Sequence, residues 1–104
     1  MDCIKENNCL VVFVRGKLDA VTAPDFEREM SGVTSAGEKN ILLECASLEY
    51  ISSAGLRSVL RLAKAARQKQ GRLLFCCLNG YVKEVFRMSG FSSVLEICDT
   101  REDA

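Results

Sequence analysis

The 104-residue sequence contains no histidine. A Ser-His-Asp triad and a Cys-His nucleophile pair are therefore impossible, because both need an imidazole to take up a proton. The sequence also lacks a GxxxxGKS/T phosphate loop, and no GxGxxG motif follows an expected strand. We therefore expect a protein that is not an enzyme and that holds no cofactor.

An excess of charge of either sign is also missing. The 14 Lys and Arg residues balance the 14 Asp and Glu residues, so the composition does not favour nucleic acid as a partner. No apolar run approaches the ~20 residues of a membrane span, and the first residues lack the charged-then-apolar plan of a signal peptide. We expect a cytoplasmic protein without a membrane span.

Cysteine, by contrast, is frequent. No two cysteines have CxxC spacing, and without histidine a mixed metal site cannot form, so we expect no metal. Five of the six lie in or beside apolar runs, where a free thiol behaves as a small hydrophobe. Adjacent residues of a strand point to opposite faces, which argues against a redox site shared by two neighbouring thiols. The six are Cys3, Cys9, Cys45, Cys76, Cys77 and Cys98.

Apolar runs alternate with stretches of helical spacing along the chain. Four runs are typical of buried strands: 10–14, 41–45, 72–78 and 94–97. A short edge strand at 3–6 joins the first of them through an Asn7-Asn8 turn. Three stretches are typical of helices: 22–37, with Thr22 as its cap, about 53–70, and 81–89.

This alternation predicts an α/β fold with a mixed sheet of four to five strands, covered by three to four helices. We expect a single domain over residues 1–104, with 99–104 as a frayed polar tail. The chain length is that of one ordinary domain, which can bury a core without metal or disulfide help.

Two serines, Ser52 and Ser53, stand where the second buried run gives way to the longest helix. A serine at a helix start accepts a hydrogen bond from the first free backbone N–H groups, and N-capping is the commonest use of such a residue. The first turn also favours negative charge, because the helix macrodipole is positive there. An exposed hydroxyl at this point can therefore carry a phosphate without unfolding the helix.

The helix that follows has an apolar face and a basic face. The apolar stripe consists of Leu56, Val59, Leu60, Ala63 and Ala66. The basic residues lie away from it: Arg57, Arg61, Lys64, Arg67 and Lys69. A basic face is most often simply solvated, but it is also suited to steering an acidic partner. Leu62 lies between the faces, either as core margin or as an exposed contact point.

Three segments of the chain, in this order, resemble STAS domains, in particular the single-domain bacterial anti-sigma factor antagonists. Residues 16–24 are similar to the first strand-to-helix junction of that family, and 48–56 resemble its phosphorylation motif. Residues 81–91, followed by 94–95, are similar to its third helix and last strand. The resemblance covers nearly the whole chain and implies the STAS fold.

The resemblance also implies a switch between binding partners. In this family the unphosphorylated antagonist binds an anti-sigma factor that is also a serine kinase, and a sigma factor is released. Phosphorylation of the antagonist ends the binding, and a serine phosphatase reverses it. When the phosphorylation motif is aligned on Gly55, its phosphoacceptor falls on Ser53, and Ser52 is the less favoured candidate. Ser52 stands where the motif commonly has Asp, and Ala54 replaces a hydroxyl residue. The implied partner-binding residues are Ser52, Ser53, Ala54, Gly55, Leu56, Arg57 and Arg61.

Three other interpretations stay open. The chain is an accessory subunit that docks on a transporter ATPase without phosphorylation, which the missing Asp at position 52 favours somewhat. Alternatively, Cys76 and Cys77 form a thiol-redox pair, or the 52–55 turn binds a nucleotide phosphate. In each case a monomer is the default expectation.

Overall fold

The computed structural model describes residues 2–90 and 95–103. Its elements in chain order are β1 (Cys3–Glu6), β2 (Cys9–Leu18), α1 (Ala23–Ser35), β3 (Asn40–Ile51), α2 (Ser53–Gln68), β4 (Arg72–Cys76), α3 (Gly80–Met88), β5 (Glu96–Cys98) and the short 3-10 helix η2 (Arg101–Asp103). The α/β fold that the alternation predicted is confirmed. Residues 91–94, which include the expected start of the last strand, lie outside the described residues.

The five strands form one mixed sheet in sequential order, β1-β2-β3-β4-β5. Only the β1–β2 pair is antiparallel, and its turn is the expected Asn7-Asn8, whose φ angles of 48° and 67° suit asparagine. The other neighbours are parallel, and their register aligns the apolar runs: Leu10 lies opposite Ile41, and Ile41 opposite Leu73. The carboxyl ends of β2, β3 and β4 therefore lie toward the same edge.

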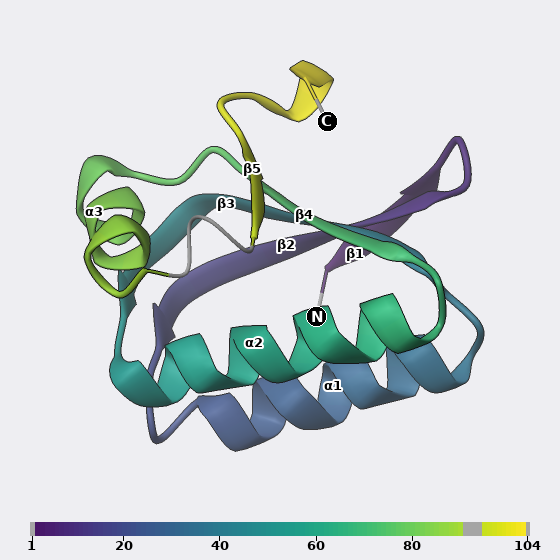
Figure 1. Ribbon diagram of the computed structural model, residues 1–104, viewed down its shortest axis with the longest axis horizontal. Coiled ribbons are helices and arrows are strands. Elements are labelled where there is room, and N and C mark those ends of the chain that lie inside the picture. The colour runs from purple at the N-terminus through teal and green to yellow at the C-terminus, as the bar shows by residue number, and fades with distance from the viewer. Residues whose placement is uncertain (1, 91–94, 104) are drawn as a thin grey trace.

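One face of the sheet carries the main core. Helices α1 and α2 run side by side along it, and α3 lies at the end of the sheet where β3 finishes (Figure 1). All three helices contribute to one cluster of buried side chains. Phe75 of β4 meets Phe86 of α3 edge to face, with ring centroids 5.5 Å apart, a preferred aromatic geometry. The packing fixes where each helix begins relative to the strand ends.

The carboxyl ends of β3 and β4 differ from those expected. Strand β3 runs on to Ile51, because Leu48 and Ile51 are buried and the strand stays paired with β2 through two irregularities in register. Exposed residues between them hide this continuation in the sequence. Strand β4 ends earlier than expected, at Cys76, because Cys77 adopts the left-handed backbone region with φ 63°.

The β2–α1 loop also differs in one detail. Thr22 precedes α1 as expected, but its hydroxyl makes no capping hydrogen bond and donates instead to the Lys17 carbonyl, at 2.9 Å. The carboxylate of Asp19 accepts from the backbone N–H of Thr22, at 3.1 Å, and of Val21, at 3.0 Å. These hydrogen bonds, that from Thr22 first, lower the pKa of Asp19. The loop is thus braced by its own side chains.

The other face of the sheet has a small apolar cluster of Val11, Leu42, Leu74 and Cys76. The segment expected to fray contains η2, whose Arg101 lies 5.7 Å from the ring centroid of Phe13. Across residues 2–90 and 95–103, no helix has the length and apolar character needed to cross a membrane.

Candidate functional site

The two serines at the start of α2 have different structural roles. Ser52 is the N-cap: its Oγ accepts a hydrogen bond from the Gly55 N–H, at 3.3 Å, and its own N–H donates to the Leu18 carbonyl, at 3.0 Å. Ser53 is the first helical residue, is exposed, and its hydroxyl makes no hydrogen bond to any residue in the described ranges. Capping and a free hydroxyl are therefore both present, on adjacent serines.

Replacing each serine by alanine should separate these roles. We expect Ser52→Ala to lower the free energy of unfolding by about 1 kcal/mol, because the cap is lost. We expect Ser53→Ala to change it by less than about 0.5 kcal/mol, as for other exposed substitutions. Urea denaturation of the two variants measures the difference, and equal losses would contradict this division of roles.

Gly55 lies against the end of β2. A Cβ built on Gly55 would stand 2.3 Å from the Leu18 carbonyl oxygen and 2.9 Å from a side-chain carbon of Ile51. The next residue, Leu56, is only 6% exposed and belongs to the core. The Leu56 side chain therefore lies in the core, as its place in the apolar stripe predicts, and Gly55 is likewise buried.

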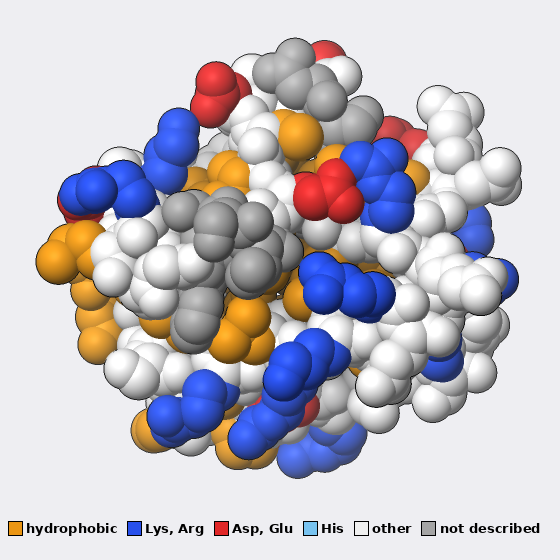
Figure 2. Space-filling view, viewed as in Figure 1, with side chains coloured by type: hydrophobic (Ala, Val, Ile, Leu, Met, Phe, Trp, Pro, Cys, Tyr) orange, Lys and Arg blue, Asp and Glu red, His pale blue; other side chains and the backbone are white. Residues whose placement is uncertain are grey.

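The exposed surface of α2 is basic. Ser53, Arg57 and Arg61 follow one another at four-residue spacing, so they lie along one helix face. The Arg57 side chain is exposed and forms no ion pair with another described residue, whereas Arg61 pairs with Glu27 of α1 at 2.8 Å. That pairing lowers the pKa of Glu27. In Figure 2 several Lys and Arg side chains lie across the lower half, where Figure 1 shows α2.

Leu62, which the sequence left between the two faces, is buried at 6% exposure and lies in the interface between α1 and α2. It is therefore a core residue. The part of the expected contact set that does reach the surface is Ser52, Ser53, Ala54, Arg57 and Arg61, with Ser52 and Ala54 half-buried.

Asn79 is a site residue that the sequence analysis did not single out. Its Oδ1 accepts from the Val82 N–H, at 2.7 Å, and so caps α3. Its Nδ2 donates to the Leu48 carbonyl, at 3.0 Å, beyond the point where β3 is paired with β4. One side chain thus fixes the start of α3 to the end of β3. The signal for the cap was an asparagine two residues before the expected helical stretch at 81–89.

The start of α2 offers few free donors to a nucleotide phosphate. The Ser52 oxygen already takes the Gly55 N–H, and the Leu56 N–H donates to the Ser52 carbonyl, at 2.9 Å. Only the N–H groups of Ser53 and Ala54 remain outside the helical pattern. The nucleotide-binding hypothesis therefore has less structural support than the sequence gave it.

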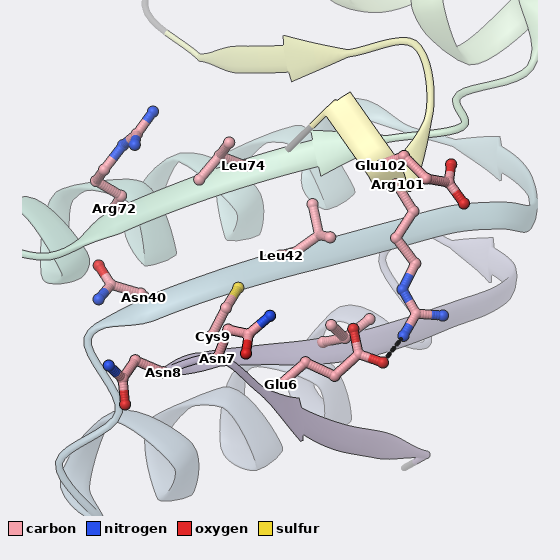
Figure 3. A pocket seen from close by; sticks show the side chains of 11 residues that line it. Glu6, Asn7, Asn8, Cys9, Asn40, Leu42, Arg72, Leu74, Arg101 and Glu102 are labelled. Atoms are coloured by element: carbon pink, nitrogen blue, oxygen red, sulfur yellow. Dashed lines mark hydrogen bonds and ion pairs between the residues drawn. The ribbon is translucent and has the colours of Figure 1, made fainter.

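A hollow of about 720 Å³ lies on the face of the sheet opposite α1 and α2 (Figure 3). Leu42 and Leu74 lie within it, between Arg72 and Arg101. Both arginines are already ion-paired, Arg101 with Glu6 and Arg72 with a glutamate of β5. This hollow adjoins the amino end of β3, whereas Ser53 follows its carboxyl end. The two features are separate.

The thiols are arranged differently from the expectation. Cys77 lies outside the strand, and its left-handed backbone lets it pack against the same cluster as Cys76, together with Cys98. The argument that Cys76 and Cys77 must face opposite ways is therefore wrong. Burial raises the pKa of Cys76 to about 12, with a further contribution from Cys77 beside it, which keeps Cys76 protonated and weakly nucleophilic. No three described Cys, Asp or Glu side chains are placed to hold a metal ion.

Native thiol titration tests this arrangement. We expect exposed Cys3 to react first with a disulfide reagent, and buried Cys45 and Cys76 to react only when the protein unfolds. Burial also raises the pKa of Cys45. Mass mapping of the labelled positions over time gives the order. Rapid labelling of Cys76 and Cys77 together would contradict it and favour the redox hypothesis.

The fold and the start of α2 define a small α/β domain that presents one serine hydroxyl beyond the carboxyl end of a central strand. A sequence model of the STAS domain matches residues 1–104, so the chain belongs to the STAS domain family. The resemblance drawn from three short segments is thereby confirmed.

Relatives and solved structures agree with this assignment. The chain is 40% identical over 100 residues to a protein of Bordetella bronchiseptica named as a candidate anti-sigma factor antagonist, BtrV; the match covers 96% of this chain and 86% of that protein. A candidate anti-sigma factor antagonist from Thermotoga maritima superimposes with a TM-score of 0.94 at 17% identity, over 98% of this chain and 88% of the other. The Bacillus cell fate determinant SpoIIAA in its phosphorylated form gives 0.73 at 19% identity, over 98% and 93%. At such identities the two structures show a shared fold alone.

Proposed function

We propose that this protein is an anti-sigma factor antagonist that is switched off by phosphorylation of Ser53. Its unphosphorylated form binds an anti-sigma factor that is also a serine kinase, and a sigma factor is released. A serine phosphatase restores the binding form. The names of the relatives support the antagonist role, and the family match supports the fold that it needs. The protein acts in the cytoplasm as a regulatory monomer.

The choice of Ser53 as the phosphoacceptor rests on the different structural roles of the two serines at the start of α2. Ser53 has an exposed hydroxyl without a hydrogen bond to the described residues, so a kinase can reach it. Ser52 is half-buried and its oxygen is used in the cap. Serine caps a helix about as well as aspartate. Ser52 can therefore cap α2 in the same way as the Asp that the family commonly has at this position.

A phosphate on Ser53 changes the charge of the surface more than its shape. It adds about −1.5 to −2 charges at neutral pH. At the first position of α2 it is favoured by the helix macrodipole, and Arg57 lies one turn along the same face. The fold is therefore retained, while a basic contact surface becomes acidic at its centre. A partner with an acidic surface is repelled, and Arg57 pairs with the phosphate instead of with the partner.

A capture experiment from the source cell tests the proposal. The baits are the wild type, Ser53→Ala, Ser53→Asp and Ser47→Asp, which adds the same charge at an exposed position of β3. We expect a kinase-type anti-sigma factor on every bait except Ser53→Asp. A transporter ATPase captured equally by all four baits would overturn the proposal and favour the accessory-subunit hypothesis.

A further inference from the structure

Two exposed tyrosines stack on each other beside the start of α2. Tyr50 is 39% exposed and comes from the end of β3, and Tyr81 is 50% exposed and comes from the first turn of α3. Their ring centroids are 5.9 Å apart and the rings are within 14° of parallel. Much of this aromatic pair therefore faces solvent without protein to cover it, although such rings bury 150–250 Å² each when covered.

The pair lies at the same end of the molecule as Ser53. Tyr50 precedes Ser53 by three residues, a length of chain that spans at most about 11 Å. Asn79 holds the start of α3, and hence Tyr81, against the end of β3. Figure 1 shows α3 and the beginning of α2 at this end, and hydrophobic side chains lie along the same edge of Figure 2. A standard interface patch of about 800 Å² covers both features.

Apart from the tyrosine pair and Val21, which is 84% exposed in the β2–α1 loop, the surface around Ser53 offers no large apolar side chain among the described residues. Ser52, Ser53 and Ala54 are small, and Arg57 is charged. Exposed ion pairs add little to affinity, whereas buried tyrosines are among the commonest hot spots of protein interfaces. A protein partner that docks over Ser53 therefore gains most of its available apolar contact from the tyrosine pair.

We propose that the Tyr50–Tyr81 pair is the apolar anchor by which this protein binds its anti-sigma factor. The partner surface that fits is an apolar socket for the two rings, bordered by carboxylates that face the basic side of α2. This inference rests on the proposed function. It adds that the energy of binding comes from the tyrosines, while Ser53 acts as the switch beside them.

Affinities of purified variants for the captured anti-sigma factor test the anchor. We expect Tyr50→Ala and Tyr81→Ala each to weaken binding by about tenfold or more, as hot-spot residues do. The phenylalanine variants keep the rings and should stay within about threefold of the wild type. Met88→Ala is the matched control, because Met88 is 76% exposed on the same helix α3 but at its other end; it should bind normally.

Tyr81→Glu provides a second route that does not depend on the stability of the alanine variants. An acidic residue in the first turn suits the helix dipole, so α3 is retained while the anchor is lost. Normal binding by Tyr81→Glu and Tyr50→Ala, with binding lost in Ser53→Asp, overturns the anchor and leaves the proposed function intact. If Ser53→Asp and the tyrosine variants all bind like the wild type, both fail.

Discussion

Gly55→Ala is expected to destabilise the protein by about 3 kcal/mol or more, the upper range for overpacking. The added Cβ would stand 2.3 Å from the Leu18 carbonyl oxygen, a backbone atom that cannot rotate away. The same oxygen accepts the Ser52 N–H, at 3.0 Å. Relief of the clash therefore requires α2 to move away from β2 and to lose this hydrogen bond. Urea denaturation and the helix signal in circular dichroism measure the effect.

Gly32→Ala is the matched control for this prediction. Gly32 is exposed within α1, and a Cβ there would meet nothing within 4 Å. We expect a gain of about 0.5–1 kcal/mol, because alanine restricts the unfolded chain and favours the helix. Opposite signs for the two Gly-to-Ala changes would show that the close approach at Gly55, and not helix propensity, sets the requirement. A loss below about 0.5 kcal/mol at Gly55 would contradict the packing described here.

The second large effect is expected for Asn79→Ala, at about 2–4 kcal/mol. The substitution removes the cap of α3, which accounts for about 1 kcal/mol. It also leaves the Leu48 carbonyl without its donor, which costs about 1–3 kcal/mol when the group is shielded from water. The end of α3 that carries Tyr81 then loses its attachment to β3.

Two further variants separate the contributions of Asn79. Asn79→Ser can cap the helix but cannot reach the Leu48 carbonyl, so about half of the loss should remain. Asn79→Asp keeps an oxygen for the Val82 N–H but turns a carboxylate toward the carbonyl, so it should be about as unstable as Asn79→Ala. If Asn79→Asp is as stable as the wild type, the amide contact with Leu48 contributes nothing.

Much of the fold follows from local features of the sequence. The Asn7-Asn8 turn, the apolar run before Cys45 and the helical spacing after Ser53 each have one dominant structural interpretation, and the structure agrees with all three. The candidate site was also visible, because a serine pair at a strand-to-helix junction has few structural uses. The observed hydrogen bond from the Gly55 N–H to the Ser52 hydroxyl shows which of the two serines caps the helix.

The features that the sequence did not reveal depend on contacts between distant residues. The amide of Asn79 and the carbonyl of Leu48 are 31 residues apart, and the stacked rings of Tyr50 and Tyr81 are equally separated in the chain. Periodicity describes only neighbours within one element, so neither contact leaves a pattern. The left-handed backbone of Cys77 was not predicted for a different reason, because that conformation is uncommon for a residue with a side chain.

The most direct measurement of the central claim is the affinity of the captured anti-sigma factor for protein that carries phosphoserine at position 53. Phosphoserine at Ser47 is the control, since it adds the same charge to β3. We expect the Ser53 phosphate to weaken binding by about 100-fold or more, because like charges at an interface cost several kcal/mol, with the urea midpoint unchanged. Equal affinities for the Ser53-phosphorylated and unmodified proteins would contradict the account.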